Sequence, residues 1–312
     1  MPHLGITLPT QASRETALEF ARRAEAAGLH SVWATDRILF RTPDPLISLA
    51  AVAAITERVK LGTCVLLGAL RRPLLLAKAV ATLDDLSGGR CILGLGVGSR
   101  AQDFAAAEVP IRERGRRMDE LLPVLRLAWS GQPIRYQGRH VQLDVGPMGL
   151  LPPQRAKLPI WFGGSAEPVL RRVASTGDGF IGGTSSGVDG FRANWTKIRA
   201  YAEQAGRDPG RITPAALIHF SVDRDRDNAR QAMRNYLVQS YGPARVDRGL
   251  GVMTGTPDDL VAGAEAYFEA GVDLLILTSI SDRPDHLDAL LEQVVPRLSL
   301  ADRRSRLARP SS

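Results

Sequence analysis

The chain has 312 residues, of which 44% are hydrophobic and 23% are charged, a composition typical of a globular protein. Its net charge is +7, but the arginines are spread along predicted helices and only 5% of the residues are aromatic, so no nucleic-acid partner is expected. A basic active-site mouth that binds an anionic cofactor or substrate explains the positive charge as well. The first ten residues carry no export signal and no apolar run reaches membrane length, so we expect a cytoplasmic protein that does not contact a membrane.

Short apolar runs alternate with helical patterns along the whole chain. The runs that we interpret as strands cover residues 4–8, 31–34, 60–67, 91–93, 159–162, 179–181, 216–222 and 274–277. Continuous aliphatic runs are typical of parallel strands that are buried on both faces. About eight such strands alternating with helices are what a TIM (β/α)8 barrel needs, so the sequence predicts an α/β protein of this fold.

One segment interrupts this alternation after the fourth helix. Residues 130–158 contain a predicted hairpin, Tyr136 to Val141, and a predicted loop, Gly146 to Pro153. A long loop inside a compact domain often has a function, for example as a lid or a substrate wall. We therefore predict a single barrel domain over residues 1–300 with an insertion at about 130–158, followed by a flexible basic tail over residues 301–312.

Two helix boundaries are marked clearly in the sequence. Gly88 and Gly89 follow the third helix, and paired glycines can adopt the positive φ that ends a helix. Thr256 is a predicted N-cap, because Pro257 and two acidic residues follow it directly. These signals predict a helix that ends before Gly88 and another that begins after Thr256.

Three predicted strands end in glycine-rich segments. In a TIM barrel the functional groups lie at the C-terminal ends of the strands, where glycines expose backbone N–H groups and hydroxyls add further donors. The residues concerned are Gly96, Gly98 and Ser99, then Gly163, Gly164 and Ser165, and then Gly182, Gly183 and Thr184. Tight βα turns alone would also explain such glycines. Three glycine-rich strand ends favour a phosphorylated cofactor.

The segment Gly96-x-Gly98-x-x-Ala101 also matches the dinucleotide-binding fingerprint of a Rossmann domain. That fingerprint needs an acidic residue about twenty positions further on, at the end of a second strand. Here Asp119 and Glu120 lie inside an amphipathic helix, and the glycines follow the fourth strand of a long series rather than the first. The Rossmann interpretation is therefore disfavoured.

Few side chains outside these loops point to catalysis. Asp36 and Arg37 end the second strand, where such a charged pair is either catalytic or an ion pair that holds the rim of the barrel. His219 lies within a strand and is expected to be a core residue. Cys64 and Cys91 lie in apolar runs, as buried reduced thiols do. No spacing of histidine, aspartate or glutamate matches a metal site, so no metal is expected.

Several motifs occur in a fixed order along nearly the whole chain. They are Ala24–Leu29 with Val32 and Trp33, Glu57–Thr63, Arg72–Leu74, Leu83–Arg90, Leu93–Gly98 and Pro159–Ser165. In content and order they resemble the bacterial luciferase-like flavin-dependent oxidoreductase family. The resemblance implies a TIM barrel, a homodimer, and FMN or the related deazaflavin F420 bound at the C-terminal mouth of the barrel.

The resemblance also implies roles for particular positions. It implies a cis peptide between Cys64 and Val65, beneath the isoalloxazine ring of the cofactor. It implies phosphate binding at the Ser165 loop, with Gly98 to Arg100 on the opposite rim. The insertion lies where members of the family carry variable segments that cover the substrate.

The chain departs from the family after the second strand. Family members commonly have an acidic residue followed by a histidine there, whereas this chain has Asp36 and Arg37. Arginine does not act as a proton shuttle near neutral pH. It is able to anchor an anionic substrate, or to stabilise a reduced or peroxidised flavin electrostatically.

The resemblance thus implies a monooxygenase that uses reduced FMN and O2 to oxidise a small organic substrate, with a separate flavin reductase as a partner. One alternative is an F420-dependent oxidoreductase that transfers a hydride on the same fold, and Asp36 and the basic charge suit it. A second alternative is a non-catalytic flavin-binding protein, because the histidine of the family is missing.

Overall fold

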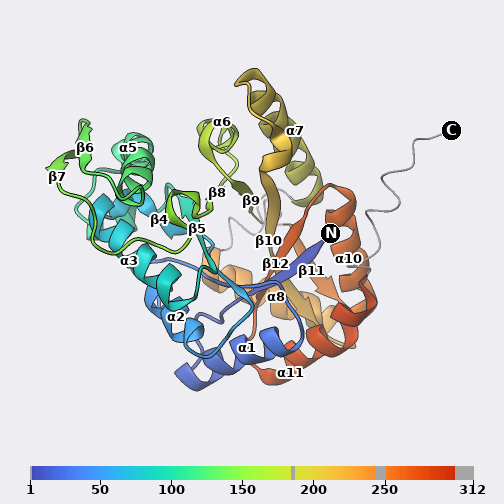
Figure 1. Ribbon diagram of the computed structural model, residues 1–312. Helices are drawn as coiled ribbons and strands as arrows, with labels where there is room; N and C mark the ends of the chain where they lie inside the picture. The colour runs from blue at the N-terminus through green and yellow to red at the C-terminus, as the bar shows by residue number, and fades with distance from the viewer. Residues whose placement is uncertain (1, 184–186, 243–250, 299–312) are drawn as a thin grey trace. The chain divides into compact units, whose positions relative to one another are not determined.

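The structure of the chain is a computed structural model that describes residues 2–183, 187–242 and 251–298 (Figure 1). The chain divides into two compact units, which are described separately below. Unit 1 comprises Met1–Val32 and Gly164–Ser312, and unit 2 comprises Trp33–Gly163. The single domain over residues 1–300 therefore stays a prediction.

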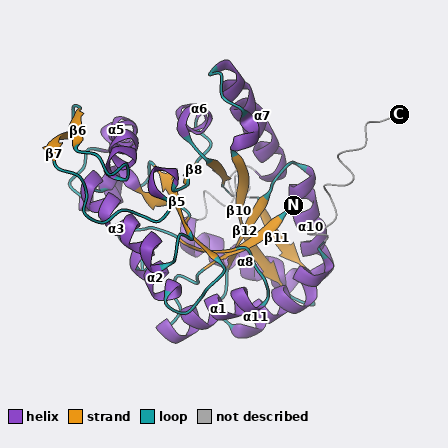
Figure 2. Cartoon of the chain, in the orientation of Figure 1, coloured by secondary structure: helices purple, strands orange, loops and turns teal. Residues whose placement is uncertain are grey.

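In both units, strands alternate with helices (Figure 2). In the ranges given above, no helix is both long enough and apolar enough to cross a membrane. The predicted basic tail over residues 301–312 lies outside the described residues.

Unit 1 is built around a parallel sheet. Its helices and strands are β1 (His3–Thr7), α1 (Arg14–Ala26), α6 (Glu167–Thr176), β9 (Gly179–Gly182), α7 (Gly187–Gln204), β10 (Thr213–Val222), α8 (Arg226–Tyr241), β11 (Val252–Gly255), α10 (Pro257–Glu269), β12 (Leu274–Ser279) and α11 (Pro284–Asp288). The long strand β10 organises the sheet. Its first half pairs with β9, its last four residues pair with β11, and β12 runs along its other edge and pairs in turn with β1.

Unit 2 is built around β5, which pairs in parallel with β3, β4 and β8. Its helices and strands are α2 (Pro45–Ala53), β3 (Lys60–Thr63), β4 (Leu66–Leu67), α3 (Pro73–Leu86), β5 (Cys91–Gly96), α4 (Ala101–Ala106), α5 (Arg114–Ala128), β6 (Ile134–Gln137), β7 (Gln142–Val145) and β8 (Ile160–Gly163). Strand β2 (Ser31–Ala34) spans the boundary between the units. Strands β6 and β7 form the antiparallel hairpin of the insertion.

The predicted strands are all present, and the differences are local. The predicted strand over residues 60–67 is divided into β3 and β4, because the chain leaves the ladder at Cys64 and Val65. Strand β11 (Val252–Gly255) contains no continuous aliphatic run and α4 has only six residues, so neither element is predicted.

Both predicted helix boundaries are confirmed. Helix α3 ends at Leu86, and Gly88 and Gly89 follow with φ of 64° and 81°. Thr256 caps α10, where its hydroxyl accepts a hydrogen bond from the Asp259 N–H while the Asp259 carboxylate accepts one from the Thr256 N–H. Local chemistry alone therefore places these two boundaries.

A buried arginine holds together the loops at one end of unit 2. The side chain of Arg90 donates to the carbonyl oxygens of Ser87 (2.6 Å), Val59 (2.8 Å), Thr56 (2.7 Å) and Ala53 (3.2 Å). It thus joins the C-terminal ends of α2 and α3 to the start of β3. Carbonyl groups that lie out of contact with water need such donors.

The end of the insertion is fixed to unit 2 by a buried carboxylate. Asp84 Oδ1 accepts hydrogen bonds from Gln154 Nε2 (2.7 Å) and from the Cys91 N–H (3.2 Å), and its Oδ2 accepts one from the Gln154 N–H (3.1 Å). Arg126 of α5 donates to the carbonyl oxygen of Leu158 at 2.7 Å. The insertion therefore returns to β8 along a defined path.

In unit 1 a histidine fastens α11 to β10 and β12. His286 Nε2 accepts a hydrogen bond from the Val222 N–H (3.2 Å), so Nδ1 carries the proton and donates to Ser279 Oγ (2.7 Å). Ser279 Oγ donates in turn to the Ser281 carbonyl (2.6 Å), and the imidazole stacks on Phe220 at 4.8 Å. Burial lowers the pKa of His286 to about 4.

Replacing Arg90 with methionine tests the role of the buried guanidinium. We expect Arg90→Met to lower the free energy of unfolding by about 2–4 kcal/mol, because several buried carbonyl groups lose a charged donor. Urea unfolding followed by circular dichroism measures the change. Arg116 on α5 is exposed, so Arg116→Met is the matched control and should change stability by less than about 0.5 kcal/mol. Equal effects of both substitutions would contradict this role for Arg90.

His286 makes the stability of the protein depend on pH. The unfolded chain binds a proton at this residue below pH 6.5, whereas the folded chain binds it only near pH 4. The contribution of His286 to the free energy of unfolding is therefore complete above pH 6.5. It decreases as the pH falls toward 4, by at most about 1.4 kcal/mol per pH unit. Urea unfolding of the wild type and His286→Gln at pH 7, 6 and 5 should show a shallower loss in the variant. The same loss in both proteins would refute the assignment.

Candidate functional site

Asp36 occupies a partly buried position just after β2. Its Oδ2 accepts hydrogen bonds from the Leu67 N–H and from Arg71 Nη2, both at 3.0 Å, and its side chain is only 7% exposed. Arg71 also donates to Asp44 Oδ2 at 3.0 Å, and Asp44 Oδ1 caps α2 by accepting from the Leu46 N–H at 2.9 Å. Asp36 thus forms an ion pair at this strand end with Arg71, whereas the charged pair predicted from the sequence was Asp36 with Arg37. A catalytic role for Asp36 stays a prediction.

The sequence analysis did not identify Arg71 as a site residue. The available signal was Asp36 itself, because a carboxylate predicted at the end of a buried strand needs a cationic or N–H partner. Through this contact Asp36 fixes β4, which directly follows Cys64 and Val65. Asp36 therefore positions the segment for which a cofactor role was predicted.

Two arginines contact one aromatic ring in unit 2. The guanidinium carbon of Arg37 lies 4.8 Å from the centre of the Phe40 ring, and that of Arg100 lies 4.1 Å from it. Arg100 also has its Nε 4.0 Å from Oδ2 of Asp103, a buried residue. These contacts bring Arg37, which follows β2, close to Arg100, which follows β5. Two positive charges held in this way suit an anionic group.

Cys64, Val65 and Gly96 also lie together in unit 2. The peptide bond between Cys64 and Val65 is cis, as the resemblance implies. A Cβ atom on Gly96 would overlap with Val65 Cγ2, so the missing side chain at this position makes room for Val65. Burial raises the pKa of the Cys64 thiol, which therefore stays protonated and serves as a small apolar group.

The segment after β5 turns sharply into α4. Gly98 has a φ of 76°, and a Cβ there would lie 3.0 Å from the Phe104 ring, so both conformation and space favour glycine. Ser99 is exposed and follows directly. The segment therefore has an exposed serine and Arg100 close to Gly98, which is the set of residues predicted for the cofactor rim.

The remaining residues predicted to bind the cofactor lie at the end of β8 and at the end of β9 in the sequence. Gly163 and Gly164 are partly exposed and Ser165 is exposed, just before α6. Helix α6 has no side-chain hydrogen bond at its N-cap, Ala166, so its first N–H groups have no cap from a side chain. Pro168 has no N–H and the Val169 N–H donates to the Ala166 carbonyl oxygen at 2.8 Å, so the Glu167 N–H is the backbone donor of this turn from which a phosphate could accept.

Gly182 and Gly183 end β9 and differ in their surroundings. A Cβ on Gly182 would lie 2.7 Å from the Phe191 ring, whereas no atom of the described residues lies within 4 Å of the corresponding position on Gly183. The missing side chain at Gly182 thus allows Phe191 of α7 to pack against the strand, whereas the described residues impose no such requirement at Gly183. Thr184 lies outside the described residues.

The hairpin of the insertion is held to α5 by one carboxylate. Glu120 accepts hydrogen bonds from the backbone N–H groups of Arg139 (3.0 Å), His140 (2.9 Å) and Val141 (3.0 Å) at the turn. The His140 ring lies 3.6 Å from Glu113 at the start of the same helix. A role of this insertion in covering the substrate stays a prediction. Across the described ranges, no group of three histidine, cysteine, aspartate or glutamate residues is placed to hold a metal ion.

Comparison with known proteins places this geometry in context. The model of the luciferase-like monooxygenase family matches residues 1–274. The F420-dependent glucose-6-phosphate dehydrogenase of Amycolatopsis mediterranei is 28% identical, over 90% of this chain and 93% of its own length. The 5,10-methylenetetrahydromethanopterin reductase of Methanopyrus kandleri is 30% identical, over 88% of this chain and 92% of its own.

Solved structures show the same fold. An F420-dependent secondary alcohol dehydrogenase, in complex with an F420–acetone adduct, superposes with a TM-score of 0.84 at 24% identity and covers 97% of this chain and 100% of its own. The oxygenating constituent of 3,6-diketocamphane monooxygenase from Pseudomonas putida, a type II Baeyer–Villiger monooxygenase in complex with FMN, gives a TM-score of 0.77 at 19% identity over 96% and 99% of the two chains. The predicted α/β TIM-barrel fold is confirmed by these likenesses. The chain belongs to the luciferase-like monooxygenase family, and it is an oxidoreductase of that family.

Proposed function

We propose that the protein is an F420-dependent oxidoreductase that transfers a hydride between the deazaflavin and a small organic substrate. The observation that carries the proposal is the similarity, over about nine-tenths of the chain, to a relative whose name specifies F420. This favours the alternative that the sequence left open over the monooxygenase that uses reduced FMN. Bound F420 supplies the redox centre, and the protein supplies position and electrostatics.

The contacts in unit 2 suit an anionic cofactor. Arg37 and Arg100 present two guanidinium groups around Phe40, where they would bind acidic groups of the coenzyme. Asp36 would orient the cofactor indirectly, because it fixes β4 beside the Cys64–Val65 peptide. Considered by itself, the start of α6 in unit 1, with Ser165 just before it, would donate hydrogen bonds to a phosphate group.

The second candidate is the monooxygenase that uses reduced FMN, with O2 and a separate flavin reductase. It is favoured by the likeness of fold to an FMN complex. Arg37 would then stabilise an anionic form of the flavin. A non-catalytic flavin-binding protein is the third candidate, motivated by arginine in place of the family histidine.

Parallel titrations with F420 and FMN separate these candidates. We expect F420, followed by its own fluorescence, to bind at least about tenfold more tightly than FMN, and the purified protein to reduce or oxidise F420 with a substrate. Tighter binding of FMN would overturn the proposal. Binding of F420 without turnover of any substrate in a panel of alcohols and carbonyl compounds would favour the non-catalytic candidate.

The role of Asp36 is tested in the same titration. We expect Asp36→Ala to weaken F420 binding by about tenfold or more, because the Leu67 N–H and Arg71 lose their shared acceptor and the segment beside Val65 moves. Asp144 is an exposed hairpin residue that pairs with Arg135, so Asp144→Ala is the matched control. Unchanged F420 affinity in Asp36→Ala would show that Asp36 does not position the cofactor segment.

We also propose that the protein is a homodimer, with the outer faces of α2 and α3 in the interface. Ile47 on α2 is 74% exposed and Leu75 on α3 is 71% exposed, and the two helices pack against each other. Such exposed aliphatic side chains favour association. Sedimentation velocity should show a dimer that Ile47→Glu with Leu75→Glu converts to a monomer, whereas Val145→Glu, on the exposed hairpin, should leave it dimeric. A monomeric wild type would contradict the proposal.

A further inference from the structure

Three neighbouring strands of unit 1 place four polar side chains on one face of the sheet. In the parallel register, His219 of β10 lies beside Thr278 of β12, and Ser221 of β10 lies beside Thr254 of β11. Residues in register point to the same face, and so do alternate residues along one strand. His219, Ser221, Thr254 and Thr278 therefore share one face, which we call the polar face.

On the opposite face of the same strands, the side chains pack against helices. Phe220 points to this side and stacks on His286 of α11. Met253, which is in register with Phe220, packs against α10, where its Cγ lies 3.1 Å from the position that a Cβ on Gly263 would take. Helices α10 and α11 thus cover this face of the sheet.

Helix α8 covers the polar face. The ring of Tyr236 lies 5.4 Å from that of His219, and the ring of Tyr241 lies 5.9 Å from it in an edge-on arrangement. The Tyr241 hydroxyl is 3.4 Å from His219 Nε2. The polar face is therefore enclosed by aromatic residues that themselves carry hydroxyl groups.

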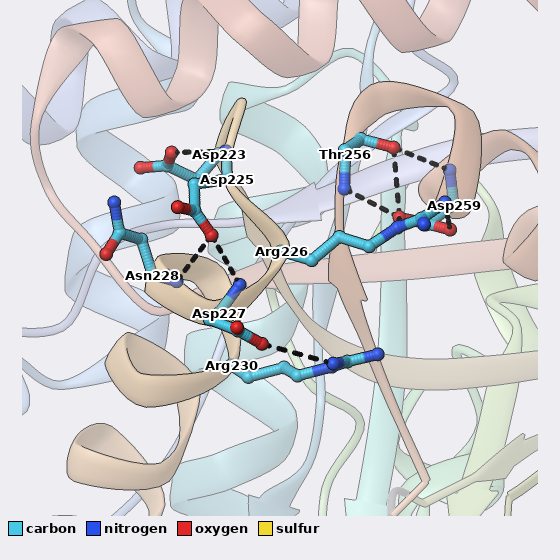
Figure 3. Close-up of polar contacts among 8 residues, drawn as sticks. All are labelled: Asp223, Asp225, Arg226, Asp227, Asn228, Arg230, Thr256 and Asp259. Carbon is cyan, nitrogen blue, oxygen red and sulfur yellow. Dashed lines mark hydrogen bonds and ion pairs between the residues drawn. The ribbon is translucent and has the colours of Figure 1, made fainter.

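A bidentate ion pair fixes the first turn of α8 (Figure 3). Arg226 Nε and Nη2 bind the two carboxylate oxygens of Asp259 at 2.7 and 3.0 Å, and Thr256 donates to the same carboxylate. These hydrogen bonds, above all those from Arg226, hold the pKa of Asp259 well below its usual value. Helix α8 is thus tethered to the start of α10, so its position over the polar face is defined.

Two hydroxyl groups of the polar face, those of Thr254 and Thr278, are buried without a hydrogen-bond partner among the described residues. Thr278 is only 8% exposed, and neither its Oγ1 nor that of Thr254 forms a hydrogen bond with any residue in the described ranges. Burying a hydroxyl without a partner is unfavourable, so native proteins rarely do so without a reason. The His219 ring, 4% exposed, lies directly beside Thr278 in the register.

We propose that the polar face binds the oxygen atom of a small neutral alcohol or carbonyl compound. The Thr278 hydroxyl would donate to this oxygen, and the His219 imidazole would exchange a hydrogen bond with it. The four residues of the polar face and the two tyrosines above it include no lysine or arginine, so the ligand class is neutral rather than a phosphate or a carboxylate. This assignment rests on the proposed function only in identifying the ligand as the substrate.

The site is testable without F420, through the ring signals of the histidines. The chain has only five histidines, so the His219 signal in protein labelled with 13C-histidine is assigned by comparison with His219→Gln. We expect cyclohexanol to shift this signal in a saturable manner and inorganic phosphate at equal concentration to leave it unchanged. A His219 signal that does not respond to cyclohexanol, or that responds equally to phosphate, would overturn the proposal.

Variants of Thr278 separate binding from a structural role. We expect Thr278→Val to weaken cyclohexanol binding by about tenfold and to raise the Tm, because an unsatisfied buried hydroxyl is removed. Thr278→Ser keeps the hydroxyl and should bind as the wild type does. Thr196 lies on α7 and donates to the Arg192 carbonyl, so Thr196→Val is the control and should leave binding unchanged.

Two outcomes would count against the site. Wild-type affinity in Thr278→Val would show that the hydroxyl does not contact the ligand. A lower Tm with unchanged affinity would show that Thr278 has a structural partner, such as a buried water. Cyclohexanol binding in a protein that fails to bind F420 would support the polar face and refute only the proposed function.

Discussion

Buried polar groups need partners, and much of unit 2 is arranged to provide them. Arg90 donates to carbonyl groups at the ends of two helices, and Asp84 accepts from the chain that returns from the insertion. Asp36 accepts one hydrogen bond from the Leu67 N–H of β4 and another from Arg71. Each of these side chains connects segments that are far apart in the sequence. The loops around the predicted cofactor residues depend on these contacts for their conformation.

Because buried polar groups need hydrogen bonds, a buried polar atom without one among the described residues indicates where another molecule could bind. Asp103 and His140 each have one buried atom without a hydrogen bond, but Asp103 lies beside Arg100 and His140 beside Glu113. The hydroxyl of Thr278 is the only polar group of its side chain, and no residue in the described part of the chain satisfies it. A ligand is therefore a stronger explanation for Thr278 than for the other two.

Local patterns in the sequence were sufficient to predict most of the helices and strands but not the site. Aliphatic runs predicted the strands, and Gly88 and Thr256 marked helix boundaries, because each depends on neighbouring residues alone. The strand β11 was missed because its residues, Val252–Gly255, do not form a continuous aliphatic run. His219 was expected to be a core residue, and it is buried, but its proximity to Thr278 follows from strand register. Register joins residues distant in the chain, which no local pattern reveals.

Charge and hydrogen bonding have different distributions in the two units. In unit 2, Arg37 and Arg100 lie around Phe40, and positive charge of this kind attracts an anionic cofactor over a distance as well as on contact. The polar face of unit 1 has no such charge on its four residues, and its hydroxyls discriminate by geometry and by the cost of leaving them unpaired. A protein that must hold a charged cofactor and select a neutral substrate needs both kinds of recognition. Because none of its four residues is a lysine or arginine, the polar face favours a neutral ligand over an anion.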